Sequence, residues 1–377
     1  MKKYKVIFTG GGTGGHVFPL VSIIRNLKDN PDESFELEMH YIGPKDKITE
    51  FNFSDEGLSV KSVFTGKLRR RFDPLAILLN ILDIIKIPIG VIQSIAQIMI
   101  ISPDLVFSKG GYGSVPMVLA ASMLRVPIIL HESDAVPGLA NRIISRFATE
   151  VFVSFQDTEG INPSKKMVVG NPIRKSILNG SYESAESRFN LQGGKPGLLI
   201  MGGSQGSERI NNNLLAVLNQ LLDDFEIIHQ CGKNNFKNIK AETEAFLPES
   251  KKGLYHPQAF FNEEELGDAY KVADLIISRA GAGSIFEITA VGKPSILIPL
   301  PEAAQDHQKE NAYRVAEKGA SIVIEEENLT PHFLMERIRS LFFQSEQLEK
   351  MKKKTDSFAK PEAGRVISAY IKEYLIS

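Results

Sequence analysis

The chain has 377 residues, enough for about two domains of ordinary size, with 43% hydrophobic and 24% charged residues. This composition excludes a globally disordered or fibrous protein, and the balance of 44 Lys and Arg against 45 Asp and Glu argues against a nucleic-acid binder. The single cysteine, Cys231, excludes an internal disulfide and a cysteine-rich zinc site. The N-terminal segment lacks the long apolar stretch of a secretory signal, so we expect a cytoplasmic enzyme.

Short apolar runs that are typical of buried strands alternate with helical patterns in the first half of the chain. The strand-like runs are residues 5–9, 37–42, 105–107, 127–130 and 151–154, and helical stretches include 20–27 and 115–124. Strands that alternate with helices predict right-handed crossovers and a parallel sheet.

Residues 74–101 are apolar over a length that could span a bilayer. The stretch is interrupted by two charged residues and two expected helix breakers, Asp83, Lys86, Pro88 and Gly90. Asn80, Asp83 and Lys86 are spaced by three, so in a helix they would form one polar stripe. This pattern favours a packed or interfacial helix over a membrane span.

The segment just before this stretch is strongly basic. Residues 57–72 contain Lys61, Lys67, Arg69, Arg70 and Arg71 and no acidic residue. Such a run beside an apolar surface could bind an anionic membrane leaflet, at about 1 kcal/mol per basic residue. It could equally be a solvated loop before a core helix.

The second half repeats the alternation after a stretch rich in Pro, Gly and Asn at residues 161–177. Its strand-like runs are residues 197–201, 226–229, 254–260, 275–278, 295–299 and 321–324. The fold class that follows is α/β, with two doubly wound domains and a ligand site at the carboxyl ends of the strands. We place the domains at 1–165 and 166–355, and the helical spacing of apolar residues after 356 predicts a tail helix that could pack on the first domain.

Three strand-like runs end in glycine clusters that open helices. They occupy residues 10–15, followed by His16, residues 202–207, and residues 279–284, followed by Glu287. Glycines let a ligand approach the backbone, and helix N-termini favour phosphate. No acid ends the second strand, as an NAD site would require, and no P-loop motif occurs. Each cluster alone could be a packing turn, but three together indicate a diphosphate ligand.

Two side chains beside these clusters could take part in catalysis or in ligand binding. His16 lies at the start of the first expected helix, where the helix dipole favours the neutral imidazole that a general base needs. A structural histidine is the alternative. Glu287 could accept hydrogen bonds from the vicinal hydroxyls of a ribose, or it could cap its own helix.

The order of these motifs resembles the MurG family of peptidoglycan N-acetylglucosaminyltransferases over roughly residues 5–345. The matching segments are residues 11–19 (GGTGGHVFP), 110–112 (GGY), 130–132 (LHE), 170–174 (GNPIR), 202–206 (GGSQG), 278–282 (SRAGA), 284–287 (SIFE), and 306–308 (DHQ) with Asn311 and Ala312.

The resemblance implies a GT-B fold and the inverting transfer of N-acetylglucosamine from UDP-N-acetylglucosamine to the muramyl 4-hydroxyl of lipid I, the undecaprenyl-linked acceptor. It implies no metal and no cofactor. It also implies work at the cytoplasmic face of the cell membrane as a peripheral protein, which gives residues 57–101 a role as a membrane-facing surface. No nucleic acid is expected as a partner.

The resemblance also implies site residues. Thr13, Gly14 and Gly15 would lie beside the diphosphate or the transferred sugar, with His16 as the base. Arg174 and Ser204 would bind the nucleotide sugar, Phe261 (or its neighbour Phe260) would contact the uracil, and Gln308 (or its neighbour His307) the donor sugar. The third loop would contribute Ala282, Gly283, Ser284, Ile285, Phe286 and Glu287, with Glu287 on the ribose.

The chain departs from the family pattern at one substrate contact. The family usually reads His-Glu-Gln-Asn, whereas residues 131–134 read His-Glu-Ser-Asp. Asp134 lacks the amide donors of asparagine, so it acts as an acceptor for sugar hydroxyls or acceptor binding differs here. Another GT-B enzyme that uses a UDP sugar, such as a glycolipid synthase or an epimerase, and a non-catalytic module with the same fold remain alternatives.

Overall fold

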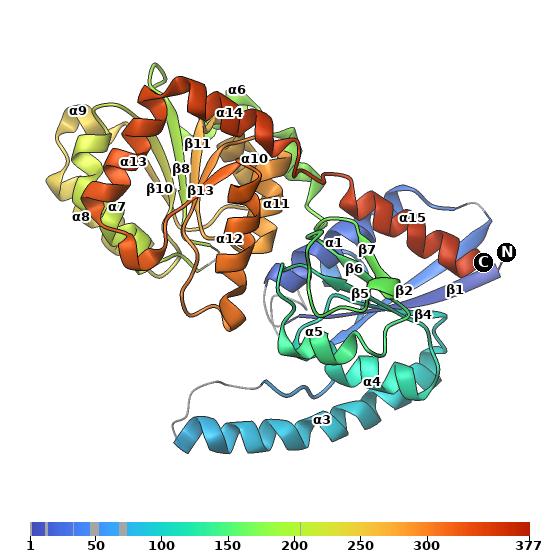
Figure 1. Ribbon diagram of the computed structural model, residues 1–377. Helices are drawn as coiled ribbons and strands as arrows, with labels where there is room; N and C mark the ends of the chain where they lie inside the picture. Colours follow the sequence, from blue (N-terminus) through green and yellow to red (C-terminus); the bar gives the residue numbers. More distant parts are fainter. Residues whose placement is uncertain (1, 12–13, 33, 46–52, 68–73, 204) are drawn as a thin grey trace. The chain divides into compact units, whose positions relative to one another are not determined.

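The computed structural model describes residues 2–11, 14–32, 34–45, 53–67, 74–203 and 205–377, without the side chains of 74–79, 82 and 304. The chain forms two compact units (Figure 1). The first comprises Met1–Ile173 together with Glu362–Ser377, and the second comprises Arg174–Pro361. The first unit therefore contains residues from both ends of the sequence.

The first unit contains a parallel sheet of seven strands in the order β3-β2-β1-β4-β5-β6-β7. The strands are β1 (Lys2–Thr9), β2 (Phe35–Gly43), β3 (Ser59–Ser62), β4 (Leu105–Ser108), β5 (Ile128–Glu132), β6 (Glu150–Val153) and β7 (Lys166–Val168). Its helices are α1 (Gly14–Asp29), α3 (Pro74–Ile101), α4 (Val115–Met123), α5 (Leu139–Ile144) and α15 (Ala363–Ile376). Strand β3 lies in the basic segment 57–72, and β7 lies in the stretch 161–177. The sequence predicted no strand in either segment.

Alternating residues of β1 show how the sheet is covered on both faces. Val6 and Phe8 pack in one cluster with α1 and α15, while Ile7 packs in another with α3 and α4. Because successive side chains of a strand point to opposite faces, a sheet buried on both sides needs continuous apolar runs. This requirement explains why most strands could be predicted from short continuous apolar runs in the sequence.

Helix α15 closes the first unit from the far end of the chain. Ile367, Ile371 and Leu375 lie in the same buried cluster as the apolar face of α1, and Figure 1 shows α15 alongside α1. The Ser368 hydroxyl donates to the carbonyl of Ile23 at 3.1 Å. Apolar burial and this hydrogen bond attach the C-terminal helix to the first.

The second unit contains a parallel sheet of six strands in the order β10-β9-β8-β11-β12-β13. The strands are β8 (Gly197–Met201), β9 (Glu226–Gln230), β10 (Tyr255–Gln258), β11 (Leu275–Ser278), β12 (Ser295–Leu297) and β13 (Ser321–Val323). The helices are α6 (Tyr182–Phe189), α7 (Glu208–Leu221), α8 (Phe236–Phe246), α9 (Glu249–Lys252), α10 (Glu263–Val272), α11 (Ala282–Ala290), α12 (His307–Glu317), α13 (Pro331–Phe343) and α14 (Ser345–Thr355). The prediction of two doubly wound α/β domains is confirmed.

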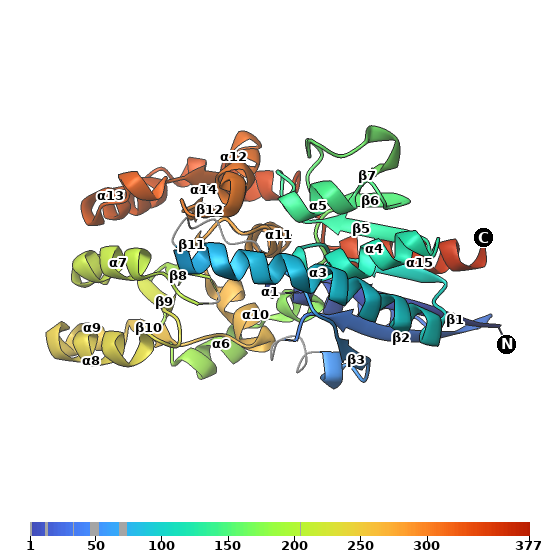
Figure 2. The ribbon, with the colours of Figure 1, turned by 90° about the horizontal axis from the view of Figure 1, so that it is seen from below.

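Helix α3 runs without a break through Pro88 and Gly90, so the expectation that these residues break it is wrong. Proline removes one hydrogen bond, at a cost of about 3 kcal/mol, but packing can hold the helix together. Gly90 is part of that packing, because a Cβ there would lie 1.9 Å from the carbonyl oxygen of Phe64. The helix lies beside α4, as Figure 2 shows from below.

The middle of the polar stripe of α3 is buried. Asp83 is 4% exposed and pairs with Lys86 at 2.6 Å. Farther along the helix, Gln93 accepts a hydrogen bond from the backbone of Phe64 at 2.8 Å, and Gln97 accepts one from the Lys61 ammonium at 2.9 Å. The polar residues of this helix thus hold the preceding segment.

The outward side of α3 is apolar, and we call it the α3 outer face. Its side chains are 43–70% exposed, and they are Ile81, Ile84, Ile85, Ile89, Ile92, Met99 and Ile100. Within the described part of the chain, the stretch Asp83–Ile101 could cross a membrane by length and composition alone, and 22% of it is buried. Core helices of soluble proteins reach the same length and composition.

A buried histidine joins two elements of the second unit. The Nδ1 atom of His229 lies 2.8 Å from the Tyr255 hydroxyl, and its Nε2 atom lies 3.0 Å from the Asn211 side-chain oxygen. The ring is completely buried, and burial lowers the pKa of His229 to about 3. The folded protein therefore keeps this ring neutral at pH values where an unfolded chain protonates it.

This difference predicts a pH dependence of stability. Because the folded pKa of His229 is depressed, its contribution is lost as pH falls below the unfolded value of about 6.5, and the free energy of unfolding drops by about 2 kcal/mol between pH 7 and pH 5. We expect His229→Gln to remove this part of the drop, as measured by urea unfolding at both pH values. His332→Gln, at an exposed position, is the control. An equal pH dependence in wild type and His229→Gln would contradict the assignment.

Candidate active site

The carboxyl ends of three neighbouring strands meet at one edge of the first unit's sheet. Strand β4 pairs with β1 on one side and with β5 on the other, all in parallel. The residues that follow these strands include Gly14, Gly15 and His16 after β1, Lys109–Tyr112 after β4, and Ser133 and Asp134 after β5. Thr13 lies outside the described residues. The predicted site residues of this unit are thus brought to a single edge.

His16 lies in the first turn of α1. Its Nδ1 atom is 3.3 Å from the carbonyl oxygen of Lys109. A carbonyl accepts and cannot donate, so the proton of the neutral ring belongs on Nδ1, and Nε2 carries the lone pair. The geometry selects the tautomer in which Nε2 can act as a base.

A glycine turn lets the ring of His16 approach. Gly111 has a φ of +79°, and a Cβ there would lie 3.0 Å from His16 Nε2. The backbone N–H of Gly111 donates to the Asn141 side-chain oxygen at 2.8 Å, which fixes the turn. A larger residue at this position would strain the backbone and crowd the imidazole.

A buried charged cluster lies beneath this turn, and we call Lys109, Glu132, Ser133, Asp134 and Asn141 the Lys109 cluster. The Lys109 ammonium donates to the Ser133 hydroxyl, which donates to Asn171 Oδ1 at 3.0 Å. Glu132 accepts from the Asn141 amide at 2.6 Å and from the backbone N–H of Asp134 at 2.9 Å. Burial lowers the pKa of Lys109 to about 8 and, together with the Asp134 charge, raises that of Glu132 to about 7.

The sequence did not single out Lys109 or Asn141. A signal was present, because Lys109 directly follows a short, largely apolar strand and precedes two glycines. Lysine is almost never fully buried unless it is paired. Its opposite charges come from residues that lie more than twenty positions away in the sequence, which is why the pairing was not visible there.

In the second unit, Arg174 and Glu287 form a buried ion pair. The guanidinium contacts Glu287 Oε1 through Nη2 at 3.0 Å and Nε at 3.3 Å, and the Tyr270 hydroxyl contacts Oε2 at 3.3 Å. Glu287 lies beyond the first turn of α11, so the alternative that it caps this helix is wrong. The two predicted donor-binding residues are therefore brought together.

The N-terminus of α11 follows β11 at the carboxyl edge of the second sheet. Gly281 is the N-cap, and Ala282, Gly283 and Ser284 form the first turn, whose N–H groups have no partner within the helix. Ile285 and Phe286 are buried. A helix start of this kind offers partial positive charge to an anion.

The second glycine cluster follows β8 at the same edge. Ser204 lies outside the described residues. The Gly203 carbonyl accepts from Gln230 Nε2 at 2.9 Å, and Arg279 Nη2 donates to the Ser207 hydroxyl at 2.6 Å. Arg279 is also paired with the buried Glu326. The sequence predicted no role for Arg279. A charged residue directly after a buried strand is nevertheless a signal that could have indicated one.

The remaining predicted contacts differ in exposure. Phe261 is 2% exposed and packs edge-on against Phe189 at 5.8 Å, whereas Phe260 is 36% exposed beneath the Lys233 ammonium at 5.4 Å. The side chain of Gln308 accepts from the backbone of Leu300 at 3.1 Å. Phe260 is therefore the more accessible of the two phenylalanines.

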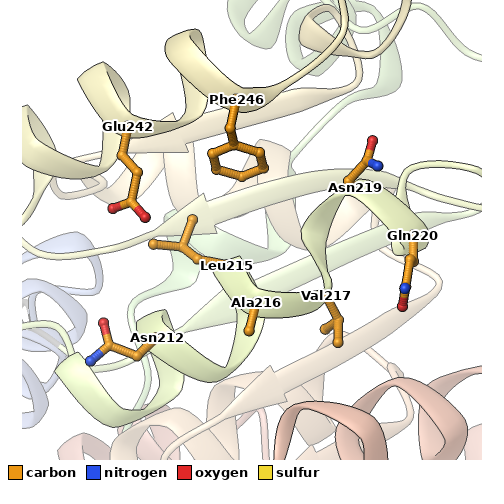
Figure 3. A pocket seen from close by; sticks show the side chains of 8 residues that line it. All are labelled: Asn212, Leu215, Ala216, Val217, Asn219, Gln220, Glu242 and Phe246. Carbon is orange, nitrogen blue, oxygen red and sulfur yellow. The ribbon is translucent and has the colours of Figure 1, made fainter.

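A surface pocket on the second unit is separate from these residues. It lies between α7 and α8, and Figure 3 shows its lining by Asn212, Leu215, Ala216, Val217, Asn219, Gln220, Glu242 and Phe246. None of the predicted site residues lines it. Across the described ranges, no group of three or more His, Cys, Asp or Glu side chains is arranged to hold a metal ion.

Known proteins match the chain along most of its length. Residues 6–153 match the glycosyltransferase family 28 N-terminal domain, and residues 197–366 match the C-terminal domain of that family. A relative from Clostridium perfringens strain SM101 is 40% identical over 90% of this chain and 91% of its own length. A relative from Bacillus thuringiensis subsp. konkukian is 36% identical over 93% and 95%. Both are named UDP-N-acetylglucosamine–N-acetylmuramyl-(pentapeptide) pyrophosphoryl-undecaprenol N-acetylglucosamine transferase.

Solved structures give the same result. A crystal structure of Acinetobacter baumannii MurG covers 98% of this chain and 99% of its own, with a TM-score of 0.74 and 27% identity. A UDP-GlcNAc 2-epimerase from Neisseria meningitidis has a TM-score of 0.67 over 99% of this chain, but its 16% identity shows the fold alone. The two domain matches and the near full-length relatives establish that the chain belongs to glycosyltransferase family 28 and, within it, to the MurG family.

Proposed function

We propose that this chain transfers N-acetylglucosamine from UDP-N-acetylglucosamine to the muramyl 4-hydroxyl of undecaprenyl-pyrophosphoryl-muramyl pentapeptide, converting lipid I to lipid II for peptidoglycan synthesis. The observation that carries the proposal is the 40% identity, over nine-tenths of the chain, to enzymes named for this transfer. The enzyme is a UDP-N-acetylglucosamine-dependent glycosyltransferase. The epimerase alternative rests on structures that share only the fold.

His16 is the proposed base of the transfer. With Nδ1–H donating to the Lys109 carbonyl at 3.3 Å, Nε2 takes the proton of the acceptor hydroxyl as the oxygen attacks the anomeric carbon. The attack displaces UDP in a single step and inverts the sugar anomer. Gly14 and Gly15, in the same turn of α1 as His16, would approach the diphosphate or the transferred sugar through their backbone, and Thr13 is proposed to contact the same groups.

The donor would bind at the carboxyl edge of the second sheet. The first turn of α11 supplies N–H groups that would stabilise the leaving diphosphate without a metal ion, and Ser204 would be a further phosphate contact. The carboxylate of Glu287 has lone pairs beyond those used by Arg174 and Tyr270, which can accept from ribose hydroxyls. Arg174 thereby orients Glu287 and adds positive charge near the diphosphate.

The remaining proposed contacts are with the uracil and the sugar of the donor, and with sugar hydroxyls at the first sheet. Phe261 or the more exposed Phe260 would contact the uracil, and Gln308 or His307 the donor sugar. Asp134, at the edge of the first sheet, would accept hydrogen bonds from sugar hydroxyls.

The proposed location is the cytoplasmic face of the cell membrane, as a peripheral protein. The α3 outer face would enter the interface between lipid headgroups and acyl chains, where its isoleucine side chains lose contact with water. Lys61 and Lys67 precede α3 in the sequence, and together with the three arginines at 69–71, which lie outside the described residues, they would add charge for anionic lipids.

A transfer assay tests the activity. We expect the protein to form the disaccharide product from UDP-N-acetylglucosamine and a short-chain lipid I analogue, with hydrolysis and epimerisation of the donor followed in the same reaction. Transfer should exceed both side reactions. Epimerisation without transfer would instead support the epimerase alternative, and no reaction at all would support a non-catalytic module.

Substitution of His16 tests its role. We expect His16→Ala to lower kcat at least about 100-fold, the usual scale for losing a general base, while UDP-N-acetylglucosamine binds with nearly unchanged affinity. Turnover and calorimetric binding are the measurements. His332→Ala, at an exposed position in α13, should behave as wild type. Near-normal turnover of His16→Ala would remove His16 from the role of base.

Substitutions on the α3 outer face test the membrane contact. Because each buried apolar side chain contributes about 1.5–3 kcal/mol, replacing Ile85, Ile92 and Met99 together by serine should lower partitioning to vesicles of anionic phospholipid at least about 100-fold. Co-sedimentation measures the partitioning. Phe343→Ser, which removes an exposed aromatic ring from the second unit, is the control. Unchanged partitioning of the triple variant would exclude this face as the contact.

A further inference from the structure

The turn beside His16 contains two consecutive glycines, and we call Gly110 and Gly111 the glycine turn. Both have a φ of +79°, and glycine loses more conformational freedom on folding than any other residue. The proposed base lies against this turn, because His16 Nδ1 is 3.3 Å from the Lys109 carbonyl and a Cβ on Gly111 would lie 3.0 Å from Nε2. The position of the glycine turn therefore influences both the tautomer of the ring and the space in front of Nε2.

Asn141 ties the glycine turn to the end of the neighbouring strand β5. Its Oδ1 atom accepts from the Gly111 N–H at 2.8 Å, and its Nδ2 atom donates to Glu132 Oε2 at 2.6 Å. The other carboxylate oxygen of Glu132 accepts from the backbone N–H of Asp134 at 2.9 Å. Asn141 and Glu132 are both buried, so water competes little for these hydrogen bonds. One buried amide thus joins the turn beside the proposed base to the loop that follows β5.

The direction of these hydrogen bonds is fixed from both ends. A backbone N–H can only donate, so the Asn141 atom that faces Gly111 is its oxygen, and its amide nitrogen faces Glu132. The carboxylate of Glu132 then accepts at both oxygens. Asn141→Asp would set two acceptors against each other, and Glu132→Gln would set two donors against each other. With these two side chains, the network has one arrangement of donors and acceptors that satisfies every member.

We propose that Asn141 is a positioning residue for the transfer reaction, whose amide holds the glycine turn so that His16 keeps its proton on Nδ1 and presents Nε2 to the acceptor hydroxyl. This inference rests on the proposed function and on the role of His16 as the base. The amide acts on the ring through the Gly111 backbone and through the Lys109 carbonyl two residues earlier. Without it, the two glycines could adopt other backbone conformations, and the carbonyl would no longer select one tautomer.

An exchange of donors and acceptors tests the proposal. We expect Asn141→Asp and Glu132→Gln each to lower kcat at least about tenfold, because each replaces a buried hydrogen bond by two like partners. The double variant, which carries both changes, restores the bond with its direction reversed and keeps the net charge. Its kcat should lie within about threefold of wild type. A double variant no faster than either single variant would overturn the proposal.

Two readouts separate positioning from structural damage. The KM for UDP-N-acetylglucosamine should stay within about threefold in both single variants, because the donor is proposed to bind on the second unit. Nitrogen NMR of protein labelled at its histidines, with His16→Gln to identify the signal, should show the Nδ1–H tautomer in wild type and a mixture of tautomers in Asn141→Ala. Partial unfolding would lower the number of active molecules without changing the tautomer in the rest. An unchanged His16 tautomer in Asn141→Ala would overturn the proposal.

Asn26→Ala is the matched control, because it removes another buried amide from the first unit. Asn26 lies in α1, and its Nδ2 atom donates to the carbonyl of Ser22 at 2.8 Å, within the same helix. We expect its kcat within about twofold of wild type and an unchanged His16 tautomer. An equal loss of kcat in Asn26→Ala and Asn141→Ala would mean that any buried amide of this unit has the same effect, and it would overturn the proposal.

Two further arms keep the test decisive. If Asn141→Asp does not fold, Asn141→Ser replaces it, since the shorter side chain can keep only one of the two hydrogen bonds. We then expect a severalfold lower kcat with an unchanged donor KM, and an unchanged kcat would contradict the proposal. Failure of wild type to transfer sugar would refute the proposed function, whereas transfer by wild type without recovery in the double variant would refute only the role of Asn141.

Discussion

Both units depend on a single constraint, the burial of an all-parallel sheet on both faces. Such a sheet has a mainly apolar interior, where a polar side chain such as that of His229 needs buried hydrogen-bond partners, so most polar side chains gather where the strands end. The carboxyl edge of the first sheet accordingly receives His16, Lys109 and Asp134, and that of the second receives Arg279 and the start of α11. The predicted site residues are concentrated at these edges because a strand end can hold a charged side chain without burying it inside the sheet.

Each edge also contains a buried cation matched to a buried acid. The Lys109 cluster does this in the first unit, and Arg174 with Glu287 and Arg279 with Glu326 do so in the second. Charges held in this way are oriented before any substrate arrives, and pre-oriented charges stabilise a transition state without reorganisation. They also tie the glycine turns to the sheets, which lets flexible backbone hold a defined geometry.

Sequence alone predicted the parts of the fold that follow from continuous burial. Most strands were found within one or two residues, whereas β3 and β7 are short, partly exposed edge strands without an apolar run. Helix α3 was expected to break at Pro88 because local rules do not include the packing of Gly90 against Phe64. The family motifs predicted the site residues, but contacts such as that of Arg174 with Glu287 join positions 113 residues apart. Only the folded chain shows which charges compensate each other.

The way in which α15 completes the first unit has a consequence for biosynthesis. The second unit lies wholly between the two segments of the first, so a ribosome delivers all of its strands before α15 emerges. Until then, the apolar face of α1 lacks the covering that Ile367, Ile371 and Leu375 provide. Exposed apolar surface of this kind makes a nascent chain prone to aggregation and a client of chaperones. The second unit can therefore fold before the first unit is complete. An mRNA truncated before the codons of α15 would yield a folded second unit attached to an incomplete first unit.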